Sequence, residues 1–321
     1  MLEILKNPDF DFLGKSRYFI AGSLIFILGG LGYMFSRNIY LGSKPQGYGV
    51  EFSGGTQLIV KFSSAPQVDR VRQAVNAVDP GAVIQTFGQP SENRVLIRTA
   101  RANETDLDAD ARRVVDSLGS LYSDNRVVES SSEVVGPVVG AELRRKAVLL
   151  TLFGLLFQLV YIAIRFKGAV WGAAATIAVF HDVLVTLAFL AFFQYEITLN
   201  VIAALLTLVG YSVNDTIVIF DRARENLRHK RKDPLRVILN DSLNQTLSRT
   251  IISNGVTFLS VLALYLFGGE VLRGFGFAMV VGILVGTYST IYIASPLVVW
   301  WQSRGGKGKG TGSSSTAKAA L

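Results

Sequence analysis

The chain has 321 residues, of which 50% are hydrophobic and only 17% are charged, so it is too apolar for an ordinary soluble domain and is expected in lipid. Cysteine is absent and there are only two histidines, His181 and His229, which excludes thiolate metal sites and disulfides and argues against a clustered-histidine metal site. The net charge of +8 does not indicate nucleic-acid binding, because most of the basic excess lies in short segments beside apolar spans.

Six windows of the sequence are long and apolar enough to cross a membrane, since a bilayer core about 30 Å thick needs roughly 20 mostly apolar helical residues. An N-terminal segment, 1–17, precedes the first window, 18–36. The other five lie within a predicted membrane bundle, 143–303, at 147–164, 168–195, 197 to beyond Asp215, 250–269 and 274–301. The tail, 304–321, is rich in Gly, Ser and Lys, so we expect it to be disordered.

Residues 37–142, between the first two windows, are polar and alternate between strand and helix patterns. Strands rich in Val, Ile, Phe or Thr are predicted at 50–62, 82–87, 94–99 and 126–135. One helix is predicted after Pro66 and another from near Thr105. This order is the ferredoxin-like arrangement, in which a four-stranded antiparallel sheet carries two helices on one face. The predicted fold class is therefore a polytopic α-helical membrane protein with six transmembrane helices and a ferredoxin-like α+β extracytoplasmic domain between helices 1 and 2.

Basic residues in the short loops predict the orientation of the chain. Lysine and arginine follow the second, fourth and sixth windows, whereas the turns at 194–196 and 268–270 contain neither. The positive-inside bias therefore places both termini in the cytoplasm and residues 37–142 on the outer side. The basic run at 228–232 is expected to meet anionic lipid or a cytoplasmic partner, or to act only as a topological anchor.

Asp215 lies inside the fourth predicted span, and an ionisable group within a bilayer is a functional hypothesis by default. Polar residues recur every seven positions along this span and therefore share one helical face: Asn200, Thr207, Asn214 and Asp221. Because such a face does not favour lipid, we expect it to line an interior polar track, together with Ser212.

The fifth predicted span has a matching polar stripe at three- and four-residue steps: Thr246, Arg249, Thr250, Ser253, Asn254, Thr257 and Ser260. A short segment joins the two spans, so Asp215 and Arg249 are expected to approach each other. Burial raises the pKa of a carboxyl group and a nearby guanidinium lowers it, so a carboxylate with alternating water access can load and release protons. The alternative is a static ion pair or a polar stripe that only holds the helices together.

The third predicted span contains a second ionisable pair, His181 and Asp182, whose side chains point about 100° apart on a helix. Only one of them can face the polar track directly. We predict that Asp182, with Asp215, Arg249 and Asn214, belongs to a proton pathway, and that His181 supports it or makes an interhelical hydrogen bond. Helix packing is assigned to three glycines, Gly210, Gly282 and Gly286, of which the last two form a small-xxx-small step.

No motif for covalent catalysis or for a bound cofactor is present in the sequence. Gly14, Lys15 and Ser16 look like the end of a phosphate loop, but Asp9 stands where its first glycine should be and a membrane span follows. Gly54 and Gly55 lie within a strand pattern, which favours a bulge or a tight backbone contact. The energy source is therefore expected to be a proton gradient and not ATP, with no cofactor and no enzyme activity.

Several segments resemble the SecF family of protein-export membrane proteins. The matching segments are Phe-Asp-Phe-Leu-Gly at 10–14, Phe-Ser-Gly-Gly-Thr at 52–56, Val-Gly-Pro-Val-Val-Gly-Ala-Glu-Leu at 135–143, His-Asp at 181–182, Gly-Tyr-Ser-Val-Asn-Asp-Thr-Ile-Val-Ile-Phe-Asp-Arg at 210–222, Arg-Glu-Asn at 224–226 and Asn-Gln-Thr-Leu-Ser-Arg-Thr at 244–250. The similarity covers nearly everything from Pro8 to Trp300. One departure is Val50-Glu51, where the family pattern has Ile-Asp.

The resemblance implies a multi-pass subunit of the bacterial cytoplasmic (inner) membrane, with residues 37–142 in the periplasm. Such a subunit pairs with SecD in a unit of the resistance-nodulation-division superfamily and associates with the SecYEG channel. The unit uses the proton motive force to assist late export of polypeptides, and the exported polypeptide, YajC and anionic lipids are further implied partners. By residue match, Asp215 and Arg249 are the positions carried over as proton-pathway residues.

Two other functions stay open at this point. One is a stand-alone proton-coupled antiporter of the same superfamily, which would move small molecules or ions without SecD. The single six-helix unit argues against it, because exporters of that type usually carry two such units in one chain. The other is a noncatalytic scaffold that positions partners. The choice between protons and sodium is likewise open.

Overall fold

The computed structural model describes residues 8–40, 47–80, 82–88, 90–99, 109–166, 168–230 and 232–305. The chain divides into two compact units, of which the first combines Met1–Gly47 with Thr151–Leu321 and the second is Tyr48–Leu150. We refer to them as the membrane unit and the sheet unit. Each unit has a hydrophobic core of its own.

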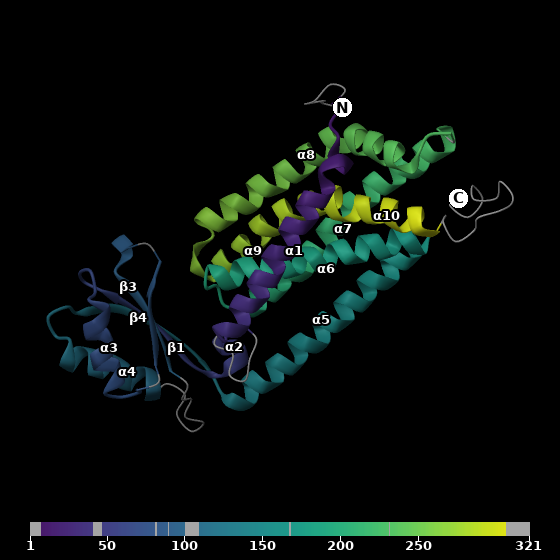
Figure 1. Cartoon of the computed structure of the whole chain (residues 1–321). Helices are drawn as coiled ribbons and strands as arrows, with labels where there is room; N and C mark the ends of the chain where they lie inside the picture. Colours follow the sequence, from purple (N-terminus) through teal and green to yellow (C-terminus); the bar gives the residue numbers. More distant parts are fainter. Residues whose placement is uncertain are drawn as a thin grey trace. The chain divides into compact units, whose positions relative to one another are not determined.

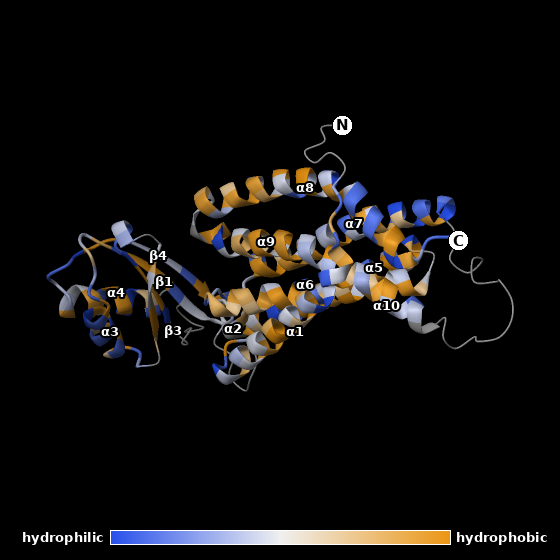
Figure 2. Ribbon diagram, turned by 45° about the horizontal axis from the view of Figure 1, so that its top comes forward, coloured by the Kyte–Doolittle hydropathy of each residue, from blue (hydrophilic) through white to orange (hydrophobic). Residues whose placement is uncertain are grey.

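Six helices in the described part of the chain are long and apolar enough to cross a membrane, which confirms the predicted fold class. They are α1 (Phe12–Ser36), α5 (Pro137–Arg165), α6 (Ala169–Phe192), α7 (Leu199–His229), α8 (Leu235–Phe267) and a composite span of α9 (Gly269–Ser289), the π-helical segment η2 (Thr290–Ala294) and α10 (Ser295–Gly305). Figure 1 shows their course, and in Figure 2 they are hydrophobic along most of their length. Hydrophilic residues gather where α7 ends and α8 begins.

Several helices continue beyond the apolar windows into polar sequence. α1 starts at Phe12 because the carboxylate of Asp11 caps it, accepting a hydrogen bond from the backbone N–H of Gly14 at 2.7 Å. α5 starts at Pro137, since proline is well tolerated at the first helical position. α8 starts directly after Pro234, so the polar segment before the predicted span at 250–269 is helical as well. An uncharged window therefore marks the lipid-facing length of a helix and not its ends.

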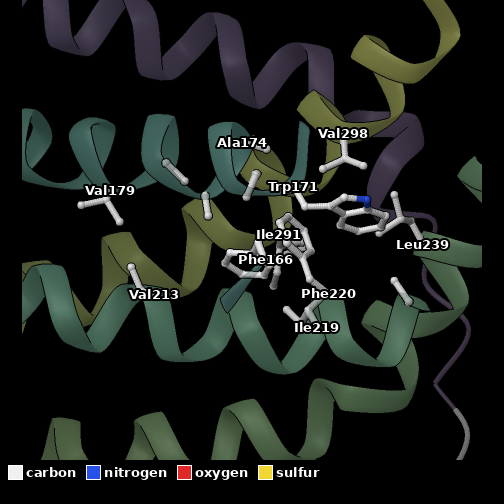
Figure 3. Close-up of a cluster of buried hydrophobic side chains, with 14 of the residues drawn as sticks. Phe166, Trp171, Ala174, Val179, Val213, Ile219, Phe220, Leu239, Ile291 and Val298 are labelled. Carbon is white, nitrogen blue, oxygen red and sulfur yellow. The ribbon is translucent and has the colours of Figure 1, made fainter. Parts of the chain in front are cut away.

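The core of the membrane unit lies where α6, α7 and the composite span meet, with the last turns of α5 added. Figure 3 shows Trp171 and Phe166 packed on Phe220. Their ring centroids lie 4.9 Å and 5.6 Å from that of Phe220, in edge-on geometry that aromatic rings favour. The composite span is the most enclosed of the six, with 67% of its most apolar stretch buried inside the chain, so it is the helix around which the others pack.

The sheet unit has the predicted ferredoxin-like topology. Its elements are β1 (Gly55–Phe62), α3 (Val68–Asn76), β2 (Val83–Phe87), the short 3₁₀ helix η1 (Pro90–Glu92), β3 (Arg94–Thr99), α4 (Ala109–Leu121) and β4 (Val127–Val135). The four strands pair antiparallel in the order β2-β3-β1-β4. Leu58, Val60 and Phe62 alternate along β1 onto one face, where they pack with Val71 of α3 and Leu118 of α4.

One predicted strand start in this unit is wrong. Residues 50–53 form the short helix α2 (Val50–Ser53), because Gly54 ends it with a φ of 69°, a conformation that favours glycine. A Cβ atom added to Gly140 would lie 3.1 Å from the backbone nitrogen of Gly54, so the two backbones also approach closely. Three other predictions lie outside the described residues: the helix start near Thr105, the basic residues 167 and 231, and the tail from 306 onward.

Helices α1 and α6 approach each other at Gly30, and this contact gives a first test of the packing. A Cβ atom added to Gly30 would overlap the methyl carbon of Ala188, whereas one added to the neighbouring Gly29 meets nothing within 4 Å. We therefore expect Gly30→Ala to lower the free energy of unfolding by about 1–3 kcal/mol, the usual cost of overpacking. Gly29→Ala is the matched control and should be neutral or stabilising by up to about 1 kcal/mol. Thermal unfolding of the purified protein in detergent compares them, and equal stabilities would contradict the contact.

Candidate functional site

Asp215 is buried between helices and is held by an amide. Only 5% of its surface is exposed, although it lies within a membrane-spanning helix. Its Oδ2 accepts a hydrogen bond of 2.5 Å from the side-chain nitrogen of Asn254 on α8. The carboxyl group therefore faces the neighbouring helices and not lipid, as its place in the span predicts.

Asn254 joins three helices at this point. Its amide nitrogen also donates to the hydroxyl of Thr287 on α9 at 2.6 Å, and its carbonyl oxygen accepts from the hydroxyl of Tyr211 on α7 at 2.8 Å. Both amide hydrogens and the carbonyl oxygen are thus engaged. Asn254 is therefore sensitive to the state of Asp215, because a protonated carboxyl group is a weaker acceptor than a carboxylate and gains an O–H that needs an acceptor of its own.

Arg249 does not contact Asp215 directly, which corrects the expected close approach of the two. Among the described residues no ion pair within 4.0 Å joins them, although their charges interact electrostatically. The reason is helical geometry, because Arg249 precedes Asn254 by five residues, which is about 140° around α8 and about 7.5 Å along it. The side of α8 that presents Asn254 to Asp215 therefore turns Arg249 outward, where it is exposed.

The middle of the seven-residue polar face of α7 does not line the interior of this chain, which also corrects the sequence prediction, whereas Asn200 and Asp221 at its ends are half-buried. Thr207, Gly210 and Asn214 are exposed, and a Cβ atom added to Gly210 would meet nothing within 4 Å. The hydroxyl of Thr207 donates to the carbonyl of Ala203 in its own helix at 2.8 Å. A seven-residue repeat shows that residues share a face but not which way the face points.

The buried face of α7 is instead offset from that repeat. It carries Leu208, Ser212, Asp215 and Ile219, at steps of four and three residues. At the far end of α7, Asp221 of the predicted polar track pairs with Arg165 and lies 3.9 Å from Arg224. On α8, Ser253 is exposed like Arg249, whereas Thr250 is buried with no hydrogen-bond partner for its hydroxyl among the described residues.

Asp182 forms a second buried carboxyl site, on α6. Its Oδ2 accepts a hydrogen bond of 2.5 Å from the hydroxyl of Ser212 on α7, and its Oδ1 lies 3.0 Å from Nδ1 of His181. A Cβ atom added to Gly286 of α9 would lie 3.4 Å from the Cβ of Ser212 and 3.7 Å from Asp182 Oδ2. One added to Gly282 would lie 2.6 Å from the methyl groups of Leu208. The two glycines thus admit α7 and the carboxyl group close to the backbone of α9.

The imidazole of His181 turns away from Ser212, toward α1. Its Nε2 lies 2.9 Å from the hydroxyl of Ser23, which lies 2.9 Å from the hydroxyl of Tyr288 on α9. The hydroxyl of Tyr288 donates to the backbone carbonyl of Phe19 at 2.7 Å. The sequence prediction did not include Ser23, Tyr288 and Thr287. The cluster of hydroxyl groups at 287–290 in an otherwise apolar span could have indicated that this span takes part in the site.

Next to these carboxyl groups the composite span departs from α-helical geometry. Thr290 begins the π-helical segment η2, and its carbonyl accepts a hydrogen bond of 2.9 Å from the hydroxyl of Ser295, five residues later. The Thr290 hydroxyl lies 3.2 Å from that of Thr216 on α7. Single π-helical turns occur often at functional sites, because they shift the helical register locally.

The N-terminal segment is fastened to the start of α8 by two asparagines. The side-chain amides of Asn240 and Asn244 both donate to the carbonyl of Phe10, and the Asn244 side chain accepts from the Phe10 N–H at 3.0 Å. Close by, Lys230 donates to Asp241 at 2.5 Å, and this hydrogen bond raises the pKa of the Lys230 ammonium group. The two asparagines tie the start of α1 to α8, and the Lys230–Asp241 pair ties the end of α7 to the same helix, which carries Asn254 and Arg249.

Similar proteins were found by sequence and by structure. The profile of the family "Protein export membrane protein SecD/SecF, C-terminal" matches residues 116–304. The protein translocase subunit SecF of Calditerrivibrio nitroreducens is 41% identical over 92% of this chain and 96% of its own length. SecF of Gemmatimonas aurantiaca is 39% identical over 95% of this chain and 90% of its own length.

Two crystal structures of SecDF resemble the chain. SecDF from Thermus thermophilus, described as a translocon-associated membrane protein, has a TM-score of 0.81 and 36% identity over 93% of this chain. SecDF in the Super-membrane-facing form has a TM-score of 0.67 and 37% identity over 95% of this chain. The alignments cover 39% and 40% of the SecDF chains, so this chain spans less than half of their length.

Proposed function

Because the chain belongs to the SecF family of protein-export membrane proteins, we propose that it is the subunit that, with SecD, uses the proton motive force to assist export of polypeptides across the bacterial cytoplasmic membrane. The observation that carries the proton role is the buried Asp215, held by Asn254 at the junction of α7, α8 and α9. A buried ionisable group in a membrane span is costly, and such groups typically mark ion or proton pathways.

Protonation of Asp215 changes two interactions of α8 at once. The ionised carboxylate accepts from Asn254 and attracts the charge of Arg249. The protonated carboxyl group loses the attraction to Arg249, and its O–H becomes a donor that needs an acceptor. α8 therefore has a different preferred position in the two states.

The energy of one proton is sufficient to drive such a change. A unit charge that crosses a potential of about 100 mV supplies about 2.3 kcal/mol. Since 1.4 kcal/mol is a factor of ten, this energy shifts a two-state equilibrium about 50-fold. One carboxyl group per chain is therefore enough to bias α8 strongly toward one position.

The exposed polar face of α7 supports a partner subunit inside the membrane. Thr207 and Asn214 lie on it, and Ser253 and Arg249 of α8 are exposed as well. Polar side chains in a membrane span usually face other helices or a water-filled cavity. A SecD subunit bound there would enclose Asp215 and Arg249 in a shared interior, and this chain spans less than half of the SecDF chains it resembles.

The proposal extends to topology and to further partners. Both termini lie in the cytoplasm and the sheet unit lies in the periplasm, where it meets the exported polypeptide. The SecYEG channel, YajC and anionic lipids are the other proposed partners. The subunit carries out no covalent chemistry and needs no cofactor, since the proton gradient is its energy source.

Export measurements in sealed inverted vesicles test the function. Vesicles that contain SecYEG, SecD and this chain should complete late export faster when a proton gradient is applied, and a sodium gradient of equal size should not replace it. Vesicles without SecD are the control and should show no such gain. Gradient-driven movement of a small molecule without SecD would favour the stand-alone antiporter instead, and gradient-independent assistance would favour the scaffold.

A further inference from the structure

The hydrogen-bond chain from Phe19 to Asp182 has an acceptor at its outer end, and this fixes the direction of every bond in it. The chain runs from the Phe19 carbonyl through the hydroxyls of Tyr288 and Ser23 to the imidazole of His181 and then to Asp182. A backbone carbonyl oxygen only accepts hydrogen bonds, and each hydroxyl has a single hydrogen to donate.

The donors can be assigned one after another along the chain. Tyr288 uses its only hydrogen on the Phe19 carbonyl, at 2.7 Å. The bond of 2.9 Å between Ser23 and Tyr288 must therefore use the hydrogen of Ser23. Ser23 then has none left, so the bond of 2.9 Å to His181 uses a hydrogen on Nε2 of the imidazole. His181 is thus protonated at Nε2.

With Nε2 protonated, the contact between His181 and Asp182 cannot be a hydrogen bond between a neutral imidazole and an ionised carboxylate. With Nε2 protonated, a neutral imidazole has a bare Nδ1, which lies 3.0 Å from Oδ1 of Asp182. A bare nitrogen and an ionised carboxylate oxygen are both acceptors. A hydrogen bond between them requires one additional proton, carried by the imidazole or by the carboxyl group. Asp182 is 1% exposed and His181 8%, so water cannot easily take the place of that bond.

We infer that the His181–Asp182 pair is a second proton-binding site and that it holds one proton in this structure. The inference extends the proposed function, on which its part in transport rests, whereas the bound proton follows from the hydrogen bonds alone. The site is distinct from Asp215, whose partners are Asn254 and, through its charge, Arg249.

The groups around the pair support this assignment. α7 contributes the hydroxyl of Ser212, which donates to Asp182 Oδ2 at 2.5 Å, and α9 contributes Ser289. α1 contributes Ser23, and Tyr288 of α9 also stacks on the imidazole, with ring centroids 6.0 Å apart. In the described part of the chain no Lys or Arg side chain forms an ion pair with Asp182, whose only such partner is His181. The proton therefore takes the role that a basic side chain would otherwise have.

Release of the proton follows the same hydrogen bonds in sequence, and the Tyr288 hydroxyl is the group that passes the proton to water. The Tyr288 hydroxyl first turns from the Phe19 carbonyl to a water molecule and gives it a proton. Ser23 then passes its hydrogen to Tyr288, and Nε2 of His181 passes its hydrogen to Ser23. The remaining proton of the pair ends on Nδ1, which donates to the ionised Asp182. One proton has left, one water molecule has gained it, and each hydroxyl has lost one hydrogen and gained one.

Nuclear magnetic resonance of nitrogen-15-labelled histidine in the full chain, reconstituted in lipid, tests the inference. The chain has only two histidines, so His229→Gln leaves His181 as the single imidazole. At neutral pH Nε2 of His181 should be protonated. Tyr288→Phe frees the Ser23 hydrogen to donate to Nε2, and Ser23→Ala removes the acceptor of Nε2, so each variant should show the signal of an unprotonated Nε2. Asp241→Asn, which removes the carboxylate that pairs with Lys230, is the control and should match the parent spectrum.

An unprotonated Nε2 in the parent protein would overturn the proposed site. A protonated Nε2 that persists in both Tyr288→Phe and Ser23→Ala would show that the hydrogen bonds from Phe19 to His181 do not hold the proton. Neither result depends on export, so the site can fail while the proposed function stands.

Discussion

Asp215→Asn is expected to reduce proton-dependent export to the level of vesicles that lack the chain. Asparagine has the shape of aspartate and its oxygen can still accept from the amide of Asn254, so the contact of 2.5 Å between α7 and α8 is preserved. The substituted side chain cannot bind and release a proton. The helices should therefore pack as before while the switch between two positions of α8 is lost.

The measurement is late export in sealed inverted vesicles with and without a proton gradient, with the amount of protein followed by immunoblotting. Asp241→Asn is the matched control, because it removes a carboxylate from α8 that pairs with Lys230 at 2.5 Å, away from the buried site. It should keep the response to the gradient. An Asp215→Asn protein that is present at the normal amount and still responds fully would rule out Asp215 as the proton carrier.

The sequence predicted the fold well because its signals are local. The sheet unit follows from alternating strands such as 94–99, which became β3 without change, and six spans follow from apolar windows. Helix α2 escaped prediction because Val50 and Phe52 are good strand residues, while the φ of 69° at Gly54 that ends this helix is a tertiary feature.

The candidate site was predicted in part. A charged residue in a membrane span indicates a buried group, but the sequence does not indicate which neighbouring side chain that group faces. Asp215 and Asp182 are both buried, as their cost in lipid demands. The partner of Asp215 is Asn254 and not Arg249, since the two residues of α8 differ by about 140° and only packing decides which one faces inward. The seven-residue repeat on α7 did not predict which way its face points either, and the middle residues of that face, Thr207 and Asn214, are exposed.

Both carboxyl groups depend on α9, and this suggests how they cooperate. Asp182 lies against Gly286, and Asp215 reaches the hydroxyl of Thr287 through Asn254. The two sites thus meet the same turn of α9, directly before the π-helical segment that starts at Thr290. A shift of this turn that follows a proton at one site would alter the contacts at the other, so we expect the two protonation events to be coupled.

Replacement of Arg249 should have the second-largest effect and should depend on Asp215. Arg249→Met removes the positive charge that favours the ionised carboxylate, so the gradient-dependent part of export should fall nearly to background. Arg249→Lys keeps a charge but not the planar guanidinium, so it should also reduce export, though less than Met. Arg236→Met, which removes an exposed arginine near the start of α8, is the matched control and should keep the response.

The double variant Asp215→Asn with Arg249→Met decides whether the two residues act as one unit. If Arg249 works only through the charge of Asp215, its removal costs nothing once that charge is gone, so the double variant should export as Asp215→Asn alone does. An Arg249→Met protein that co-purifies less SecD than Asp215→Asn does would show that Arg249 also acts on a partner subunit at the exposed face of α8. Export is measured in the same vesicle assay and SecD by co-purification, with the four proteins present at equal amounts.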